Sequence, residues 1–275
     1  MKIGYLGPDG TYCYEAMVKY MKHYKIEAET ISFNNITETI LAVKNSEIDK
    51  CIVPIENSIQ GSVLETMDTL RETDGLYIQS RIVIDIEHHL LSAKKCVPEE
   101  IKKIYSHPQA IAQCRKYIHN NYPNCEIKQV SSTALAAKAI MNEENCACIC
   151  NGVCRDLYNL KELDENIQDI ENNQTTFIVV SKEKNNNLKG ELTTSIFFSV
   201  YSRPGELYKV LGLFNIFEVN LNKIESRPAK TKLGEYIFWV DFEGNENCDY
   251  IKILLEQIDK RCSYYRFLGT YEHVE

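Results

Sequence analysis

Several features are absent from this 275-residue sequence, and each absence excludes a class of protein. No apolar run approaches the roughly 18–20 residues that a membrane-spanning helix needs. Basic residues are not in excess, because the formal net charge is −8. That charge argues against nucleic acid or an anionic membrane surface as the main partner. The sequence also contains neither a glycine-rich phosphate loop nor a dinucleotide-binding fingerprint, which disfavours a nucleotide ligand.

The sequence also shows neither the pattern of a targeting segment nor that of a disulfide framework. The start, MKIGYLGPDG, enters a strand directly, so we expect no signal or transit peptide. The eleven cysteines are scattered and odd in number, unlike those of a secreted disulfide scaffold. Their densest group has no histidine nearby, and we interpret it as small buried thiols rather than a metal site. We expect a reducing, cytoplasmic location and no metal or cofactor. The group is Cys146, Cys148, Cys150 and Cys154.

The composition present is that of an ordinary soluble globular protein, with 44% hydrophobic and 25% charged residues. The length favours two or three folding units. A polar stretch, KEKNNNLKGE, separates two regions of different pattern and is typical of a linker. We therefore expect a domain at residues 1–181, a linker at 182–192 and a second domain at 193–275.

The first region repeats one pattern four times: a short apolar run, a small polar junction, then sequence with helical periodicity. This order predicts strands joined by crossover helices, hence an α/β fold with mostly parallel sheet. Ser62 with Glu65, and Ser106 with Gln109, fit capping boxes at two helix starts. The four runs are KIGYLG to YCYEAMVKYMKHY, KCIVPI to SVLETMDTLRE, IKKIY to SHPQAIAQCRKYI, and EIKQV to SSTALAAKAIMNEE.

The polar junctions are the candidate binding positions of this fold. In open α/β sheets, ligands bind beyond the carboxyl ends of the strands, where helix N-termini point. Each junction offers backbone N–H groups and a hydroxyl or amide, although the same residues also cap helices for stability alone. One helix terminus contributes only about 0.3–1 kcal/mol to anion binding, so several must converge on a small polar anion. The junctions are Gly10-Thr11, Asn57-Ser58, Gly61-Ser62, Ser106-His107 and Ser131 to Thr133.

The second region follows another pattern. Its order of strands and helices is βαββαβ, which is the order of a ferredoxin-like α+β module. The strands alternate half-buried with half-exposed residues, so we expect an independent module whose sheet pairs with another copy.

Seven motifs, in this order, resemble prephenate dehydratase followed by an ACT regulatory domain. The resemblance implies a two-lobed catalytic domain like a periplasmic binding protein, plus a ferredoxin-like ACT domain. No chorismate mutase segment precedes Met1, so we expect a monofunctional chain. The motifs are YLGPDGTY (5–12), VPIENSIQGSVLETMD (53–68), His88-His89, YSHPQAIAQCRKY (105–117), VSSTALAAK (130–138), ENNQTTF (171–177) and ESRP (225–228).

The resemblance also implies an activity and its residues. Prephenate would be converted to phenylpyruvate, carbon dioxide and water in phenylalanine biosynthesis, with phenylalanine as the feedback effector. Thr175 corresponds to the family threonine that assists loss of the hydroxyl. The substrate-binding residues implied are Thr11, Asn57, Ser58, Ser106, His107, Ser132, Thr133, Thr176 and Phe177. The effector residues implied are Gly205, Leu207, Glu225, Ser226 and Arg227, although Glu225 and Arg227 could also form a plain surface ion pair.

Two departures from the family pattern leave alternatives open. Thr176 replaces the family's arginine, and Glu206 replaces the alanine of its Gly-Ala-Leu motif. Arogenate is an alternative substrate, and a catalytically impaired amino-acid-sensing homologue is a second alternative. His88 and His89 are expected at a hinge between the two lobes. We expect a homodimer or a dimer of dimers, because ACT sheets commonly pair.

Overall fold

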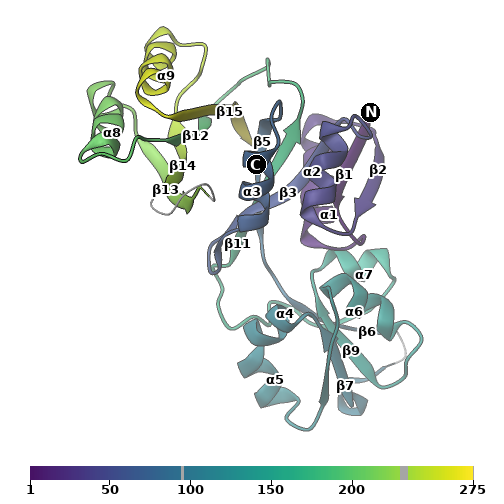
Figure 1. Cartoon of the computed structure of the whole chain (residues 1–275). Coiled ribbons are helices and arrows are strands. Elements are labelled where there is room, and N and C mark those ends of the chain that lie inside the picture. The colour runs from purple at the N-terminus through teal and green to yellow at the C-terminus, as the bar shows by residue number, and fades with distance from the viewer. Residues whose placement is uncertain (94–95, 230–234, 275) are drawn as a thin grey trace.

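The computed structural model describes residues 1–93, 96–229 and 235–274. Three bodies are visible in Figure 1: a first lobe at the N-terminus, a second lobe below it, and a C-terminal domain with two outer helices. The predicted fold class, a two-lobed α/β domain followed by a βαββαβ domain, is confirmed. Within the described residues, no helix is both long and apolar enough to cross a membrane.

The first lobe is built on a mixed sheet. Parallel pairing of β1 with β2 and β3 follows from the crossover helices, and the buried stripe of α1 packs on that part of the sheet. The returning strand β11 lies antiparallel between β3 and β5. The elements are β1 Lys2–Leu6, α1 Tyr12–Tyr24, β2 Glu29–Phe33, α2 Ile36–Lys44, β3 Lys50–Asn57, β4 Gly61–Ser62, α3 Leu64–Glu72, β5 Tyr77–Asp85 and β11 Gln174–Ser181.

The second lobe has its own sheet, of order β10-β6-β9-β7-β8. Its strands β9, β7 and β8 are parallel, whereas β6 and β10 pair antiparallel. The prediction of mostly parallel sheet is therefore wrong where the chain crosses between the lobes, because β6, the first strand after the crossing, runs opposite to both of its neighbours. The elements are β6 His89–Ser92, a 3-10 turn Pro98–Glu100, β7 Lys103–Ser106, α4 Pro108–Gln113, α5 Arg115–Asn121, β8 Glu126–Gln129, α6 Thr133–Ile140, β9 Cys146–Cys150, α7 Val153–Leu157 and β10 Lys161–Asp164.

The cysteine group lies in the core of the second lobe. Cys146, Cys148 and Cys150 belong to β9, and Cys154 follows in α7. All four are buried and free, so the interpretation as small buried thiols is confirmed.

The C-terminal domain is less independent than the sequence predicts. Its helices α8 and α9 cover one face of the sheet, and the other face shares a core with the first lobe through Trp239 and Tyr271. The last strand, β15, pairs with β12 and also pairs parallel with β5. The sheet of the first lobe and that of the C-terminal domain therefore form one continuous sheet. The elements are β12 Leu192–Ser199, α8 Glu206–Ile216, β13 Leu221–Pro228, β14 Tyr236–Glu243, α9 Asp249–Arg261 and β15 Tyr264–Val274.

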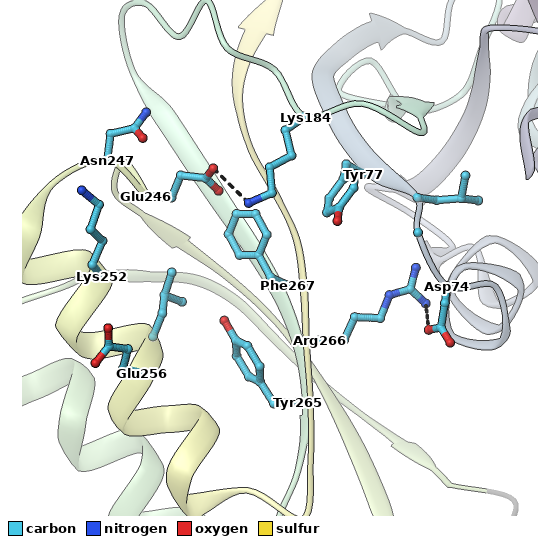
Figure 2. Close-up of a pocket in the computed structure, with 13 residues that line it drawn as sticks. Asp74, Tyr77, Lys184, Glu246, Asn247, Lys252, Glu256, Tyr265, Arg266 and Phe267 are labelled. Atoms are coloured by element: carbon cyan, nitrogen blue, oxygen red, sulfur yellow. Dashed lines mark hydrogen bonds and ion pairs between the residues drawn. The ribbon is translucent and has the colours of Figure 1, made fainter.

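A groove of about 580 Å³ marks the junction between the first lobe and the C-terminal domain (Figure 2). Ion pairs cross it from Lys184 to Glu246, at 3.3 Å, and from Arg266 to Asp74, at 3.5 Å. Lys184 also lies over the ring of Phe267, 4.4 Å from its centroid. Because its main charges already pair with one another, this groove is a structural joint and not the best candidate for an anion site.

Both predicted capping boxes are wrong. The N-cap of α3 is Val63, and the Ser62 hydroxyl instead bonds residues of the C-terminal domain. The N-cap of α4 is His107, whose Nδ1 accepts from the Gln109 backbone N–H at 3.2 Å. Ser106 is buried and donates to the Ile149 carbonyl at 2.6 Å. In each case a tertiary partner takes the hydroxyl that local sequence assigns to the helix.

Candidate active site

A cleft of about 300 Å³ lies between the two lobes. The first lobe, the second lobe and the connection between them all contribute side chains. Seven of the residues proposed from the sequence line it: Thr11, Asn57, His107, Ser132, Thr133, Thr175 and Phe177. The cleft is also lined by Leu6, Tyr12, Cys13, Pro54, Gln60, Val63, Ile86, His88, Gln109, Ala110, Gln113 and Ser131.

Helix starts from both lobes meet at this cleft. Thr11 is the N-cap of α1, and its hydroxyl accepts from the Tyr14 backbone N–H at 3.2 Å. Ser132 is the N-cap of α6 and accepts from the Leu135 N–H at 3.0 Å. The remaining first-turn N–H groups have no partner within their own helix. The positive ends of two helices, one from each lobe, therefore face the same space.

The cleft is lined by neutral donors. Among the described residues that line it there is no lysine, arginine, aspartate or glutamate. Its polar groups are hydroxyls, side-chain amides, two imidazoles and the helix starts. Such a site suits an anion, because helix N-termini bind carboxylates, while it offers no carboxylate to a cationic group.

Thr175 lies at the start of β11, in register with Asn57 of β3. The Asn57 side-chain N–H group donates to the Thr175 Oγ1 at 2.9 Å. An acceptor bond from Asn57 leaves the hydroxyl proton of Thr175 available to a group in the cleft. Thr175 is thus positioned as a hydrogen-bond donor.

Asn57 is held rigidly in turn. Its Nδ2 also contacts the Asn173 Oδ1 at 2.8 Å, and its Oδ1 accepts from the backbone N–H groups of Ile59 and Gln60, each at 3.0 Å. The side chain is buried, so all of its polar atoms need these partners. Asn57 therefore fixes both the turn after β3 and the Thr175 hydroxyl.

His107 presents a donor to the same space. As the N-cap of α4, it accepts the Gln109 N–H at Nδ1. A neutral imidazole that accepts at Nδ1 carries its proton at Nε2. His107 can therefore donate to a bound anion.

Three other proposed residues lie away from the cleft. Ser58 bonds the Asn172 carbonyl and the Gln174 N–H, at 3.3 and 2.9 Å. Ser106 is buried in the second lobe. Thr176 faces the side of the sheet opposite Thr175 and accepts from the Arg81 Nη2 at 3.4 Å. These side chains do not line the cleft, and for Thr176 the reason is the alternation of side chains along a strand.

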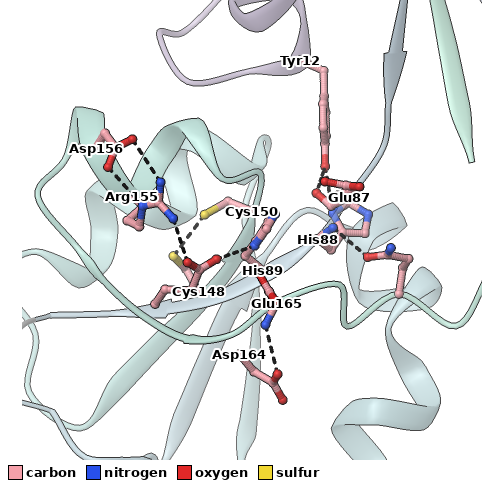
Figure 3. A network of polar contacts seen from close by, with 12 residues as sticks. Tyr12, Glu87, His88, His89, Cys148, Cys150, Arg155, Asp156, Asp164 and Glu165 are labelled. Atoms are coloured by element: carbon pink, nitrogen blue, oxygen red, sulfur yellow. Dashed lines mark hydrogen bonds and ion pairs between the residues drawn. The ribbon is translucent and has the colours of Figure 1, made fainter. Parts of the chain in front are cut away.

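The connection between the lobes carries a polar chain (Figure 3). Tyr12 reaches from the first lobe to His88, with its hydroxyl 3.1 Å from Nδ1. The His88 Nε2 lies 2.7 Å from the Gln113 Oε1 of the second lobe. Burial lowers the pKa of His88, so the ring stays neutral. His89 instead contacts Glu162 of β10, within the second lobe, at 2.5 Å. His88 lies between β5 of the first lobe and β6 of the second, and His89 is the first residue of β6, where the sequence predicts a hinge.

Gln109 and Gln113 were missed by sequence reasoning. Both line the cleft, four positions apart on one face of α4. Gln109 lies two positions and Gln113 six positions after the helix N-cap His107. This spacing could have indicated from the sequence that they lie near His107. Gln60 was missed as well, and it lies in the turn fixed by Asn57.

A buried carboxyl group between the lobes, that of Glu15, makes stability depend on pH. The Asn151 Nδ2 donates to the Glu15 carboxylate at 3.2 Å, and Asn151, only 1% exposed, has no partner for its Oδ1 among the described residues. Burial raises the Glu15 pKa from 4.5 to about 7, helped by the charges of Glu87 and Asp85 and opposed by the Asn151 hydrogen bond and Lys19. The folded chain therefore retains a proton that the unfolded chain releases, and stability falls as pH rises through that window.

We expect Glu15→Gln to remove this loss of stability. Its neutral amide keeps an acceptor for Asn151 and adds a donor for the Asn151 Oδ1. Thermal unfolding should give similar Tm values for both proteins near about pH 5 and a higher Tm for the variant near about pH 8. A Tm difference that is the same at both pH values would contradict the assignment.

The proposed effector residues fall into two groups. Gly205 and Leu207, with Glu206, line a groove of about 490 Å³ at the start of α8. Glu225 and Arg227 do not line it, because they face the first lobe, where Arg227 contacts Asp68 at 3.1 Å. Ser226 is exposed on the opposite face of β13 and is also absent from the groove. The five proposed residues therefore do not gather in one groove within a single chain, and effector binding by Glu225, Ser226 and Arg227 stays a prediction.

The fold and the cleft define a class: a two-lobed α/β protein with a polar cleft between its lobes, joined to a small βαββαβ domain. The family model for prephenate dehydratase matches residues 3–185, and that for the ACT domain matches residues 194–247. The chain therefore belongs to the prephenate dehydratase family, and it is an enzyme with an ACT domain.

Relatives and solved structures agree with this family. Prephenate dehydratase of Methanocaldococcus jannaschii is 36% identical, over 97% of this chain and 96% of that protein. The enzyme of Bacillus subtilis is 33% identical, over 99% of each. The crystal structure of prephenate dehydratase from Arthrobacter aurescens in complex with L-Phe matches with a TM-score of 0.89 and 30% identity, covering 99% of this chain and 90% of that one.

Proposed function

We propose that the inter-lobe cleft binds prephenate and that Thr175 assists its dehydration to phenylpyruvate. The observation that carries this is the convergence of two helix starts and the Thr175 hydroxyl on one cleft without acidic residues. A dianion needs donors at both ends, and the two lobes supply one helix start each. Release of phenylpyruvate from prephenate by the purified chain is the direct test.

In the proposed reaction the ring carboxylate leaves as carbon dioxide. The electron pair of the broken carbon–carbon bond enters the ring and makes it aromatic. The carbon–oxygen bond at the opposite ring carbon breaks with its electron pair on oxygen, which takes a proton from solvent and leaves as water. Thr175 donates a hydrogen bond to that oxygen while its negative charge develops, and Asn57 holds the donor in place.

Prephenate is favoured over arogenate by the lining of the cleft. Arogenate carries an ammonium group, for which no carboxylate is available among the described lining residues. Turnover of prephenate and of arogenate, each at equal concentrations, gives kcat/KM for both substrates and distinguishes the two hypotheses. A higher kcat/KM for arogenate would reverse the assignment. The hypothesis of a catalytically impaired homologue is weakened, because Thr176, the departure nearest the cleft in sequence, does not line it.

The groove at the start of α8 is the proposed phenylalanine site. Its aromatic lining includes Tyr201, Tyr236 and Phe238, and the helix start with Arg203 can take a carboxylate. The L-Phe complex of the relative from Arthrobacter aurescens supports an effector of this chemistry. Tyr208 beside it is 80% exposed, which favours a second copy of the chain covering this face in a homodimer.

We expect phenylalanine to raise the Tm of the wild-type protein and to inhibit turnover. Leu207→Asp places a carboxylate in the groove, so it should abolish both responses while leaving turnover without effector within about twofold. Turnover and thermal shift at increasing phenylalanine concentration measure this. An unchanged inhibition curve in the variant would place the effector elsewhere.

We also propose the domain limits 1–181, 182–192 and 193–275, supported by the end of β11 at Ser181, while β12 begins at Leu192, one residue before the proposed second domain. A cytoplasmic location is supported by eleven cysteines that are all free.

A further inference from the structure

The hairpin of β3 and β4 has two faces with different partners. Its inner face carries Asn57 and Gln60, which line the cleft. Its outer face carries Glu56 and Ser62, which lie opposite each other across the two strands. Contacts to Glu56 and Ser62 on the outer face therefore affect the position of Asn57 and Gln60 on the inner face.

Lys223 of the C-terminal domain holds that outer face. Its Nζ lies 3.0 Å from the Glu56 Oε2, 2.8 Å from the Ser62 Oγ and 3.5 Å from the Glu225 Oε2. Ser62 also donates to the Glu225 carboxylate. The ammonium group donates a hydrogen bond to Ser62 and forms ion pairs with both carboxylates.

We propose that Lys223 is a positioning residue for the dehydratase reaction, acting from the ACT domain on the hairpin that carries Asn57. The path is short: Lys223 holds Glu56, Glu56 is the chain neighbour of Asn57, and Asn57 donates to the Thr175 hydroxyl. Each link is a direct contact or a peptide bond. The proposal rests on the role given above to Thr175.

The lysine side of this contact is largely buried, whereas the Glu56 side chain is 40% exposed. The Lys223 side chain is 14% exposed, so its charge is partly desolvated and needs all three acceptors. A second ion pair lies close by, where Arg227 of the same strand contacts Asp68 of α3. Strand β13 therefore contacts both the hairpin and the helix that follows it, and a shift of the hairpin would break these contacts.

Thr176 lies directly opposite Glu56 on the neighbouring strand. Its hydroxyl is neutral, so the cation beside Glu56 in this chain is Lys223 of the ACT domain. The position of the catalytic turn therefore depends on how that domain is docked.

The test compares Lys223→Met with Glu56→Gln and the double variant in the full-length chain, without phenylalanine. We expect each single variant to lower kcat by about tenfold with KM within about twofold, because a displaced donor weakens the transition state more than substrate binding. The double variant should be no worse than either single one, since both remove the same contact. Lys223→Arg, which keeps the charge, should retain about half of the wild-type kcat.

Thermal unfolding and a matched control separate positioning from folding. Lys260→Met removes an exposed lysine of α9, 3.9 Å from Glu256, and should change neither kcat nor KM. Folded Lys223→Met with wild-type kcat, or losses that multiply in the double variant, would overturn the proposal. If Thr175→Ala retains activity, the proposed role of Thr175 is refuted, and the role of Lys223 that rests on it is refuted as well. If that variant is inactive and Lys223→Met is unaffected, only the present inference fails.

Discussion

Thr175→Ala should lower kcat for prephenate by about 10²–10³, with a much smaller change in KM. Removing a preorganised donor that faces a developing negative charge costs about this much in enzymes. The Thr175 hydroxyl accepts from Asn57 and lines the cleft, so its proton is directed to the ligand and not to the protein. Steady-state turnover with purified variant and wild type measures the loss.

Two further substitutions at this position isolate the hydroxyl from the shape of the side chain. Thr175→Ser keeps the donor and should retain most of the turnover, whereas Thr175→Val keeps the shape and should match Thr175→Ala. Wild-type-like kcat in the valine variant would show that packing at the start of β11 matters and the hydroxyl does not.

Asn57→Ala should have the second largest effect, about a hundredfold in kcat, together with a lower Tm. The alanine leaves the Thr175 hydroxyl without its orienting donor and the N–H groups of Ile59 and Gln60 without an acceptor. Ile59 and Gln60 are exposed, so water can replace the lost acceptor, and the loss of stability should be about 1 kcal/mol. Turnover and thermal unfolding are both needed to measure the two consequences.

Asn35→Ala is the matched control for that variant. Asn35 also uses its side-chain oxygen to accept a backbone N–H, from Glu38 at 2.7 Å, but it caps α2 and does not line the cleft. Its loss should cost about 1 kcal/mol in stability and leave kcat unchanged. Equal effects of the two alanine variants on kcat would show that the loss at Asn57 reflects stability alone.

The sequence by itself determined the fold class, the family and the helix starts that form the cleft. These features are local or ordered along the chain: a cap such as Thr11 or Ser132 is written beside its helix, and the motifs keep their order. The sequence also determined that Thr175 and Phe177 share one face of their strand, because side chains alternate.

The tertiary structure alone decided which face that is. Adjacent threonines have the same local propensity, and only the packing of the lobes and the ACT domain separates Thr175 in the cleft from Thr176 beside Arg81. It also turned Glu225 toward Ser62 and gave Ser106 a buried carbonyl in place of a helix cap. Such contacts join residues far apart in the chain, and their partners are set by three-dimensional docking, which no local pattern encodes.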